Sequence, residues 1–190
     1  MWEELAVELR GHIVTLEPLT SEHRDGLRAA AADERTWDFM VTRDVERWLD
    51  DAFAEHDGGT RVQFAVLHDG TIAGSTSYLS LVPEHLRIEI GNTWLNPSAW
   101  GTGANVEAKY LLLRHAFETL GLRRVEFKTD ARNERARSAL AALPARFEGI
   151  HRKHMLVRDG ERRDSAWYAV IDDEWPEVKG NLELRIARRR

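Results

Sequence analysis

A glycine pair between a strand-like run and a helical run is the most chemically suggestive feature of the sequence. Gly101 and Gly103 stand near the middle of the segment 96–108. Glycine adopts backbone conformations that are closed to other residues, so successive N–H groups can point into one concavity at the positive end of the following helix. Such a turn can bind phosphate. The spacing alone is equally compatible with a tight turn that simply needs glycine.

Two nucleotide-binding motifs can be compared directly with this turn. The P-loop requires Lys and Ser or Thr after its last glycine, but Gly103 is followed by Ala104 and Asn105, which excludes it. The dinucleotide fingerprint needs a third glycine where Val106 stands. It also needs a parallel βαβ unit, whereas the preceding runs indicate an antiparallel hairpin, so this motif fits poorly.

The runs around the turn predict the elements that would position it. A β-rich run over 87–95 ends at Asn96 and Pro97, because proline cannot donate to a strand ladder. After Gly103 the apolar residues recur at helical spacing up to Gly121. Other runs predict strands over 12–17, 62–67, 72–81, 123–129, 146–157 and 166–171, and helices over 21–32, around 48–53 as far as 58, over 133–143 and from 173 onward. The Asp69-Gly70 turn predicts a hairpin.

Composition limits the classes of protein that remain. The chain has 190 residues, no cysteine, 43% apolar residues and a net charge of −5, which favours one domain over 1–190 with 173–190 as a C-terminal helical extension. Absence of cysteine excludes disulfides, thiolate nucleophiles and cysteine-ligated zinc. The acidic balance gives no general attraction to nucleic acid, and no apolar run is long enough to span a membrane. The opening residues lack a signal-peptide pattern, so we expect a cytoplasmic protein.

The turn resembles a known family. The GNAT superfamily of acetyl-CoA-dependent N-acetyltransferases places Gln/Arg-x-x-Gly-x-Gly/Ala between a strand and a helix. Trp100-Gly101-Thr102-Gly103 and Glu107-Ala108 are similar to the Trp-Gly-x-Gly-x-x-x-Glu-Ala form of the bacterial RimJ/RimL-like branch. The resemblance continues through 124–130, 133–135 and 163–168 and covers about residue 10 to 177. It implies a mixed, mostly antiparallel α/β (α+β) sheet of about seven strands, flanked by helices and splayed in the middle.

The resemblance also implies positions for the coenzyme. The backbone N–H groups that would hold the coenzyme A pyrophosphate are those of Trp100, Gly101, Thr102, Gly103, Ala104 and Asn105. Leu95 would offer its N–H to the thioester carbonyl, as an oxyanion-hole donor does. Asn133 would lie beside the pantetheine arm, or would simply cap a helix. Two positions depart from the pattern: Trp100 replaces Gln or Arg, and Asn105 stands where Gly or Ala is commoner.

Acetyl transfer to an amine needs a base, because the amine is mostly protonated at neutral pH. Strand alternation puts Glu89, Gly91, Thr93 and Leu95 on one face, which makes Glu89 the candidate. Its distance from Leu95 along the strand, about 20 Å, requires that it act through water. The alternative is a solvated carboxylate paired with Arg87.

A proton donor for the departing thiolate is harder to find. The family commonly carries Ser or Tyr at the positions occupied here by Ala136 and Leu140, and neither of these can donate a proton. Tyr168 is the remaining candidate, with a structural role in the core as the alternative.

Two other pairs of residues have types that could do chemistry. His151 and His154 lie three apart on a strand, which predicts opposite faces and surface positions, and no metal site is expected. Trp37 and Trp48 are predicted to pack in the core, with a wall of the acceptor pocket as the alternative.

The function that the resemblance implies is acetyl-CoA-dependent N-acetylation by direct transfer in a ternary complex. The acceptor would be a protein N-terminal α-amine or a small-molecule amine. A homodimer is compatible with an apolar face on the terminal helix. The alternative is a noncatalytic acyl-CoA-binding regulatory or scaffold module, which Ala136 and Leu140 favour.

Overall fold

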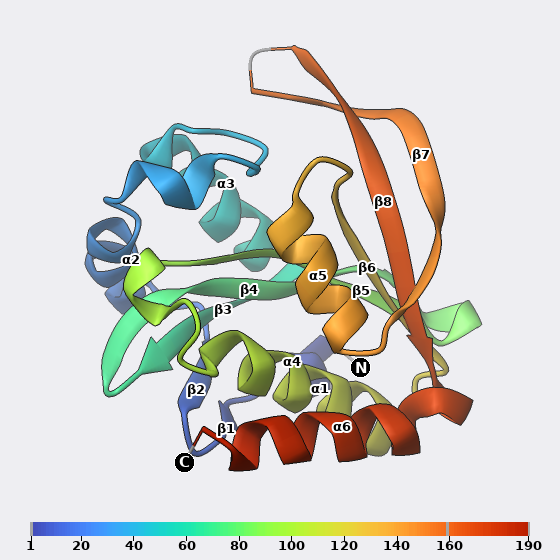
Figure 1. Cartoon of the computed structure of the whole chain (residues 1–190). Coiled ribbons are helices and arrows are strands. Elements are labelled where there is room, and N and C mark those ends of the chain that lie inside the picture. Colours follow the sequence, from blue (N-terminus) through green and yellow to red (C-terminus); the bar gives the residue numbers. More distant parts are fainter. Residues whose placement is uncertain (1, 159, 190) are drawn as a thin grey trace.

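The computed structural model describes residues 2–158 and 160–189, and an eight-stranded sheet forms its centre (Figure 1). The strands are β1 (Leu9–Arg10), β2 (Val14–Pro18), β3 (Arg61–His68), β4 (Thr71–Val82), β5 (Arg87–Leu95), β6 (Arg124–Asp130), β7 (Arg146–Val157) and β8 (Glu161–Ile171). Their order is β1-β2-β3-β4-β5-β6-β8-β7. The expected mixed, mostly antiparallel α/β fold is confirmed. The strand beyond the expected seven is β1, whose two residues are too few to show an alternating pattern.

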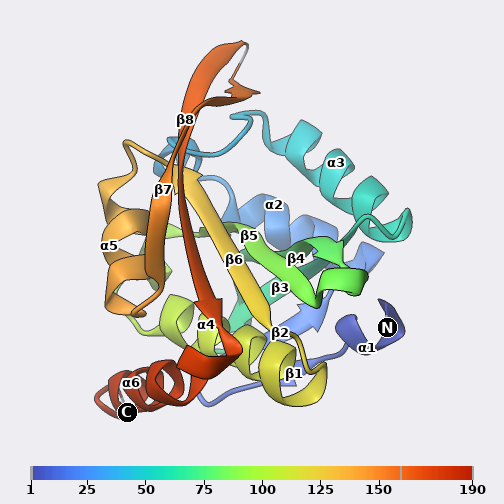
Figure 2. The same cartoon turned by 90° about the vertical axis from the view of Figure 1, so that its right-hand side faces the viewer.

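Helices cover both faces of this sheet. They are α1 (Trp2–Leu5), α2 (Arg24–Ala30), α3 (Val45–Asp57), α4 (Ala104–Arg114), α5 (Glu134–Ala142) and α6 (Trp175–Ala187), and a π-helical turn over His115–Thr119 extends α4. Short 3-10 turns occupy Ser21–His23, Glu34–Trp37, Pro83–His85, Pro97–Ala99 and Asp172–Glu174. Figures 1 and 2 show α2 and α3 on one face and α4 and α6 on the other. No helix within the described ranges is long and apolar enough to cross a membrane.

Local sequence signals account for the hairpin and the helix ends. Asp69 and Gly70 join β3 to β4 with φ angles of 51° and 74°, the left-handed pair that a two-residue hairpin turn requires. Gly121, with φ of 64°, follows the end of the α4 region. Asn133 caps α5, since its side-chain oxygen accepts from the Ala136 N–H at 3.0 Å. These predictions are confirmed.

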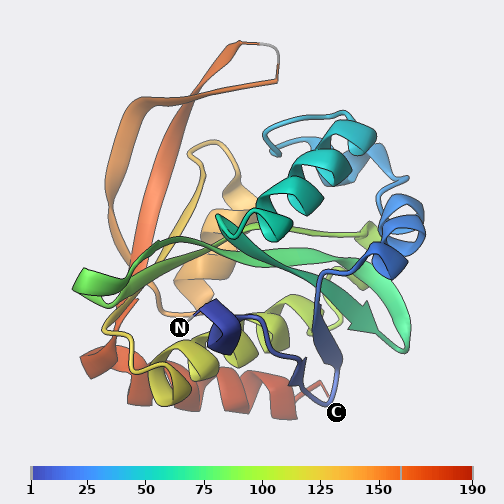
Figure 3. The same cartoon turned by 180° about the vertical axis from the view of Figure 1, so that it is seen from behind.

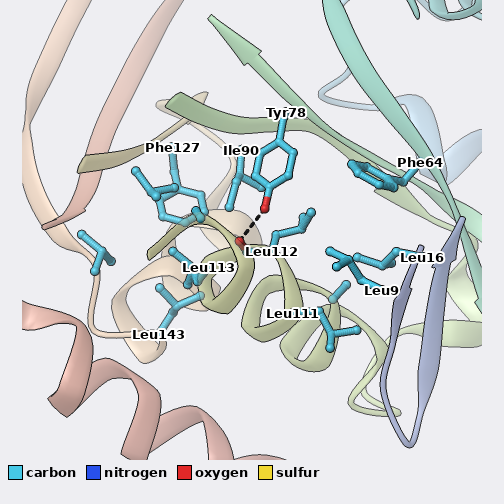
Figure 4. Close-up of a cluster of buried hydrophobic side chains, with 14 of the residues drawn as sticks. Leu9, Leu16, Phe64, Tyr78, Ile90, Leu111, Leu112, Leu113, Phe127 and Leu143 are labelled. Atoms are coloured by element: carbon cyan, nitrogen blue, oxygen red, sulfur yellow. Dashed lines mark hydrogen bonds between the residues drawn. The ribbon is translucent and has the colours of Figure 1, made fainter. Parts of the chain in front are cut away.

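The apolar core is divided by the sheet. On the α4 side, Figure 4 shows Tyr78 and Phe127 packed over the leucines of α4, with the Tyr78 hydroxyl donating to the Leu112 carbonyl. Complete burial raises the pKa of Tyr78 well above its ordinary value. On the α2 and α3 side, Trp37, Trp48 and Trp94 contact one another with ring centroids 5.2–6.0 Å apart. Trp37 and Trp48 are therefore core residues.

The sheet opens between β5 and β6, the one parallel pair among the described strands. They are paired at three positions only, Arg87 with Arg124, Ile88 with Val125 and Glu89 with Glu126. Beyond these positions both strands continue without pairing to each other. The expected central splay is therefore present, and it starts directly after Glu89.

The β7–β8 hairpin rises beyond the rest of the sheet (Figures 1 and 3). Near its tip, Arg158 connects it to the segment between α2 and α3. Its backbone N–H donates to the Val41 carbonyl at 2.8 Å, and its Nη1 donates to the Met40 carbonyl at 2.7 Å. These two hydrogen bonds join the β7–β8 hairpin, at one edge of the sheet, to the segment between α2 and α3, which covers the other half of the sheet.

A buried carboxylate ties α4 to the first strands. Glu107 is 2% exposed, and its carboxylate accepts the backbone N–H groups of His12, Ile13 and Val14 at N···O distances of 2.5–3.0 Å. Hydrogen bonds to a charged acceptor are about twice as strong as neutral ones. Glu107 therefore fixes the start of α4, and the glycine turn before it, against the N-terminal strands.

We expect Glu107→Ala to lower the free energy of unfolding by about 3 kcal/mol, because one buried and two partly buried N–H groups lose their charged acceptor. Urea denaturation measures the loss. The matched control is Glu177→Ala in the first turn of α6, where the side chain is exposed, and its effect should stay within about 0.5 kcal/mol. Equal losses in the two variants would contradict the role of Glu107.

Candidate functional site

A cavity of about 660 Å³ occupies the opening between β5 and β6. Its walls come from β5 from Glu89 onward, from β6, from the beginning of α4, from α5 along its length, and from the end of α6. The segment between α2 and α3 and part of the β7–β8 hairpin close it on another side. Because two strands have separated here, polar backbone and side-chain groups face a space large enough for an elongated ligand.

The glycine turn forms one end of the cavity. Gly101 and Gly103 have φ angles of 77° and 103°, so both need the conformational freedom of glycine. No protein partner is described for the N–H groups of Gly101, Thr102 and Gly103 within residues 2–158 and 160–189. The first turn of α4 adds the free N–H groups that every helix start presents. The turn can therefore bind an anion.

Two of the six predicted N–H donors already have partners. The Trp100 N–H donates to the Pro97 carbonyl at 3.1 Å, and the Ala104 N–H donates to Thr102 Oγ1 at 3.3 Å. Of the six N–H groups that were expected to hold the pyrophosphate, four therefore remain available, those of Gly101, Thr102, Gly103 and Asn105.

Trp100 closes the turn with its side chain. Its indole Nε1 donates to the Leu95 carbonyl at 2.8 Å, which joins the turn to the last residue of β5. The Arg135 guanidinium lies 3.5 Å from the centre of the indole ring. An aromatic ring thus stands where the family pattern has Gln or Arg, and it brings a cation from α5 to the turn.

Further cations reach the cavity from the end of α6. Arg185, Arg188 and Arg189 all line the cavity, and Arg189 Nη1 donates to the Gly101 carbonyl. Sequence reasoning missed the contact of Arg189 with the turn, because α6 packs on α4 through a tertiary contact that no local pattern encodes.

Leu95 lies as predicted at the end of β5, on the cavity wall. It faces Gly74 of β4 as a pair that exchanges no hydrogen bonds, since the neighbouring Asn96 N–H donates to the Ala73 carbonyl at 2.8 Å. In such a pair the N–H groups point away from the partner strand. The Leu95 N–H is therefore directed to the side from which β6 has separated.

β5 contains a bulge that alternation could not reveal. Asn92 has φ of 47°, and the pairing with β4 shifts by one residue at this point. The Asn92 side chain accepts from the Trp48 indole N–H at 3.3 Å, so the tryptophan cluster supports the bulge. The expectation that Glu89 and Leu95 share one face through Gly91 and Thr93 is wrong, because a bulge interrupts the two-residue period.

Glu89 is on the cavity wall where the splay begins, and its side chain is 2% exposed. Its Oε2 lies 2.8 Å from Lys128 Nζ and 3.3 Å from Ser80 Oγ. Arg87, the predicted alternative partner, instead pairs with Glu126 at 3.1 Å. Among the described residues that line the cavity, Glu89 is the one with a carboxylate side chain.

Lys109 of α4 is a buried cation that sequence reasoning missed. Its Nζ donates to Thr93 Oγ1 at 2.7 Å, and no carboxylate pairs with it among the described residues. Burial lowers the pKa of Lys109 to about 7, against the attraction of Glu89. One signal was present: Lys109 follows Asn105 by four residues and so lies on the same helix face.

Tyr168, the candidate proton donor, is not among the described residues that line the cavity. It is 4% exposed in the core, and its hydroxyl accepts from Arg137 Nε at 3.2 Å. We therefore withdraw its catalytic assignment. Ala136 and Leu140 do line the cavity and present only apolar surface there, and Asn133 lines it beside them.

The two histidines of β7 correct another expectation. His151 and His154 have ring centroids 5.7 Å apart and both contact Trp167, so they lie on one side of the strand. A bulge with Lys153 at φ of 51° lies between them and reverses the alternation. Within the described ranges, no three His, Asp or Glu residues gather as a metal site would require.

Comparison with known proteins agrees with this geometry. The acetyltransferase (GNAT) domain family matches residues 14–145. The uncharacterized N-acetyltransferase p20 of Bacillus licheniformis is 27% identical over 138 residues, which are 73% of this chain and 76% of that protein.

Solved structures agree as well. A putative acetyltransferase from T. thermophilus is 41% identical with a TM-score of 0.85, covering 94% of this chain and 96% of that one. A GCN5-related N-acetyltransferase from Brucella melitensis is 34% identical with a TM-score of 0.86, covering 94% and 85%. Mycobacterium smegmatis RimJ with CoA-disulfide (23% identical, TM-score 0.77, 94% and 93%) and RimL with coenzyme A (18%, 0.75, 88% and 99%) share the fold.

The buried Lys109 makes stability depend on pH. Between its folded pKa of about 7 and the ordinary value of 10.5, the unfolded chain holds a proton that the folded chain has released, so stability rises with pH. We expect Lys109→Met to be more stable than the wild type at pH 6, with an advantage that shrinks toward pH 10. Denaturation across this pH range measures it. Lys153→Met, at an exposed site, should show no such trend.

Proposed function

This chain belongs to the GNAT acetyltransferase family of acetyl-CoA-dependent N-acetyltransferases, and we propose that it acetylates a primary amine by direct transfer in a ternary complex. The observation that carries the proposal is the cluster of N–H groups at Gly101, Thr102 and Gly103 that find no partner among the described residues, at one end of a cavity that opens at the splay. The chain has no cysteine, so a thiolate cannot carry the acetyl group as an intermediate.

Acetyl-CoA fits the distribution of charge along the cavity. Its pyrophosphate would accept the free N–H groups of the turn and the first turn of α4, as anions do at helix N-termini. Arg135, Arg188 and Arg189 would neutralise its phosphates. The pantetheine arm would run between β5 and β6, past Asn133. The RimJ and RimL structures, which share the fold, contain coenzyme A, and this supports acetyl-CoA as the cosubstrate.

The residues around the splay supply the acid and base chemistry. Glu89 would take the proton of the incoming ammonium through water, and the neutral amine would then attack the thioester carbon. The Leu95 N–H would stabilise the oxyanion. When the carbon–sulfur bond breaks, protonated Lys109 would give its proton to the thiolate, directly or through Thr93. Lys109 thereby fills the role that Ala136 and Leu140 cannot.

The acceptor that the family branch suggests is a protein N-terminal α-amine, since RimL is a ribosomal L7/L12 alpha-N-protein acetyltransferase. A small-molecule amine is the second candidate. The noncatalytic acyl-CoA-binding module is the alternative function, favoured by the apolar surface of Ala136 and Leu140. Acceptor-dependent release of coenzyme A thiol separates an enzyme from such a module.

We also propose that residues 1–190 form one acetyltransferase domain with 173–190 as its C-terminal extension. The packing of α6 on α4 supports this proposal. A homodimer would use the exposed side of α6, where Leu184 is 64% exposed.

We expect Gly101→Ala to weaken coenzyme A binding about tenfold or more, because the new Cβ would stand in the anion-binding concavity. Gly121→Ala is a matched control: both glycines have left-handed φ angles, 77° and 64°, and both have open space around an added Cβ. The two variants should therefore lose similar stability, about 1 kcal/mol. Calorimetric titration with coenzyme A distinguishes them, and equal affinities would mean that the turn does not hold the diphosphate.

The pH dependence of kcat tests the acid and base roles. Glu89→Gln should lower kcat about 100-fold at pH 7, with a smaller deficit at high pH where free amine is abundant. The wild type should lose activity above about pH 7 as Lys109 releases its proton, and Lys109→Met should be slow without this decline.

Glu126→Gln is the control for these variants, because Glu126 is paired in register with Glu89 but is not among the described cavity residues. Its profile should match the wild type. A wild-type profile in Glu89→Gln would remove Glu89 as base, and a retained decline in Lys109→Met would remove Lys109 as donor.

A further inference from the structure

The cavity is strongly cationic although the chain is acidic. Nine of its described lining residues are Arg or Lys and one, Glu89, is acidic, whereas the whole chain carries −5. The lining cations are Arg35, Arg61, Lys109, Lys128, Arg135, Arg163, Arg185, Arg188 and Arg189. Arg135 and Arg189 contact the glycine turn, Arg188 stands next to Arg189, and Arg185 donates to the Ala142 carbonyl. Lys128 pairs with Glu89, Arg35 pairs with Asp33, and Lys109 donates to Thr93. Two cations are left, Arg61 and Arg163.

Arg163 lies on β8, beyond the stretch of that strand that pairs with β6. It is 6% exposed and lines the cavity with Met155, its partner on β7. No hydrogen bond or ion pair is described for its side chain anywhere in residues 2–158 and 160–189, and its Nε is buried without a partner. Burial lowers the pKa of Arg163, against the attraction of Asp130.

The acidic groups near Arg163 are committed elsewhere. Asp130 accepts from Arg132 and Arg158. Burial alone would raise the pKa of Asp130, but these hydrogen bonds outweigh it and lower the pKa to about 2. Glu89 is paired with Lys128. Arg61 is paired with Glu55 at 2.6 Å, yet its Nε is also buried and has no partner in the part of the chain that the structure describes.

A buried guanidinium without a partner costs free energy, since it has lost water and gained no acceptor. Such a group is stabilised when a ligand supplies the acceptor. A carboxylate suits it best, because its two oxygens match the two parallel N–H donors of a guanidinium.

We propose that Arg163, with Arg61 on the same cavity, binds a carboxylate group of the acceptor substrate. This rests on the proposed function and narrows its substrate class to amines that carry a carboxylate, such as an amino acid or a peptide with Asp or Glu near its N-terminus. Charge also orients such an acceptor: Glu89 attracts its ammonium and repels its carboxylate, while Arg163 does the reverse.

The test compares acceptors that differ only in charge. Peptides of the same length with Asp or Asn, and Glu or Gln, at the second position are assayed for acetylation, together with a free amino acid and its amide. We expect the wild type to prefer each carboxylate member at least about tenfold in kcat/KM, as a charged hydrogen bond of this kind provides. Arg163→Met should remove the preference by raising KM for that member, and should leave the amide member within about twofold.

Arg162→Met is the matched control. Arg162 is the preceding residue on β8 and is exposed, so the same charge is removed outside the cavity. Its preference should equal that of the wild type. Without acceptor, Arg163→Met should unfold at a higher temperature than the wild type, because the unpaired buried charge is gone. A structural arginine would give a lower unfolding temperature in this variant.

Calorimetric binding of the Asp and Asn peptides, with coenzyme A present, separates this proposal from the proposed function. Tighter binding of the Asp peptide to the wild type and not to Arg163→Met supports the carboxylate site even if no peptide is acetylated. Equal binding of both peptides to the wild type overturns it, as does a carboxylate preference that survives in Arg163→Met.

Discussion

The separation of β5 and β6 after three paired residues is the constraint on which the rest of the structure depends. Two strands that part inside a sheet leave backbone N–H and carbonyl groups without ladder partners, and buried polar groups must find others. Here the Trp100 indole takes the Leu95 carbonyl, and the Leu95 N–H is left toward the opening. The bulge at Asn92 and the glycine turn lie at the same separated end of β5. The site is therefore lined by backbone groups that lost their partners when β5 and β6 separated.

The site also concentrates charges that weaken the fold. Lys109 and Arg163 are buried cations without a carboxylate partner among the described residues, and each disfavours the folded state. The chain compensates with well-paired charges elsewhere, such as Glu107 on three N–H groups and Asp130 between two arginines. The residues that destabilise the fold thus line the cavity where a ligand is expected, and the residues that stabilise it lie outside the cavity. This distribution is common at functional sites.

Structural features that depend on residues adjacent in the sequence could be predicted, and features that depend on residues far apart in the sequence could not. The hairpin at Asp69-Gly70, the Asn133 cap and the glycine turn each follow from a short motif. The bulges at Asn92 and Lys153 were missed, because a left-handed φ is uncommon at residues other than glycine; asparagine adopts it more readily than lysine does, but a single Asn within a strand does not identify a bulge. The arginines of α6 and the isolation of Arg163 escaped as well, since both depend on which elements meet in three dimensions.

Glu107 is separated by 93 to 95 positions in the sequence from residues 12–14, whose N–H groups donate to its carboxylate. Closing so long a loop costs conformational entropy. The hydrogen bonds of Glu107 can offset this cost only after the strands between the two segments have formed the sheet. During synthesis, the first strands must therefore wait for α4 to emerge before either is locked. It follows that a nick or a fusion just ahead of residue 12 would alter the shape of the glycine turn, which lies about 90 positions further along the chain.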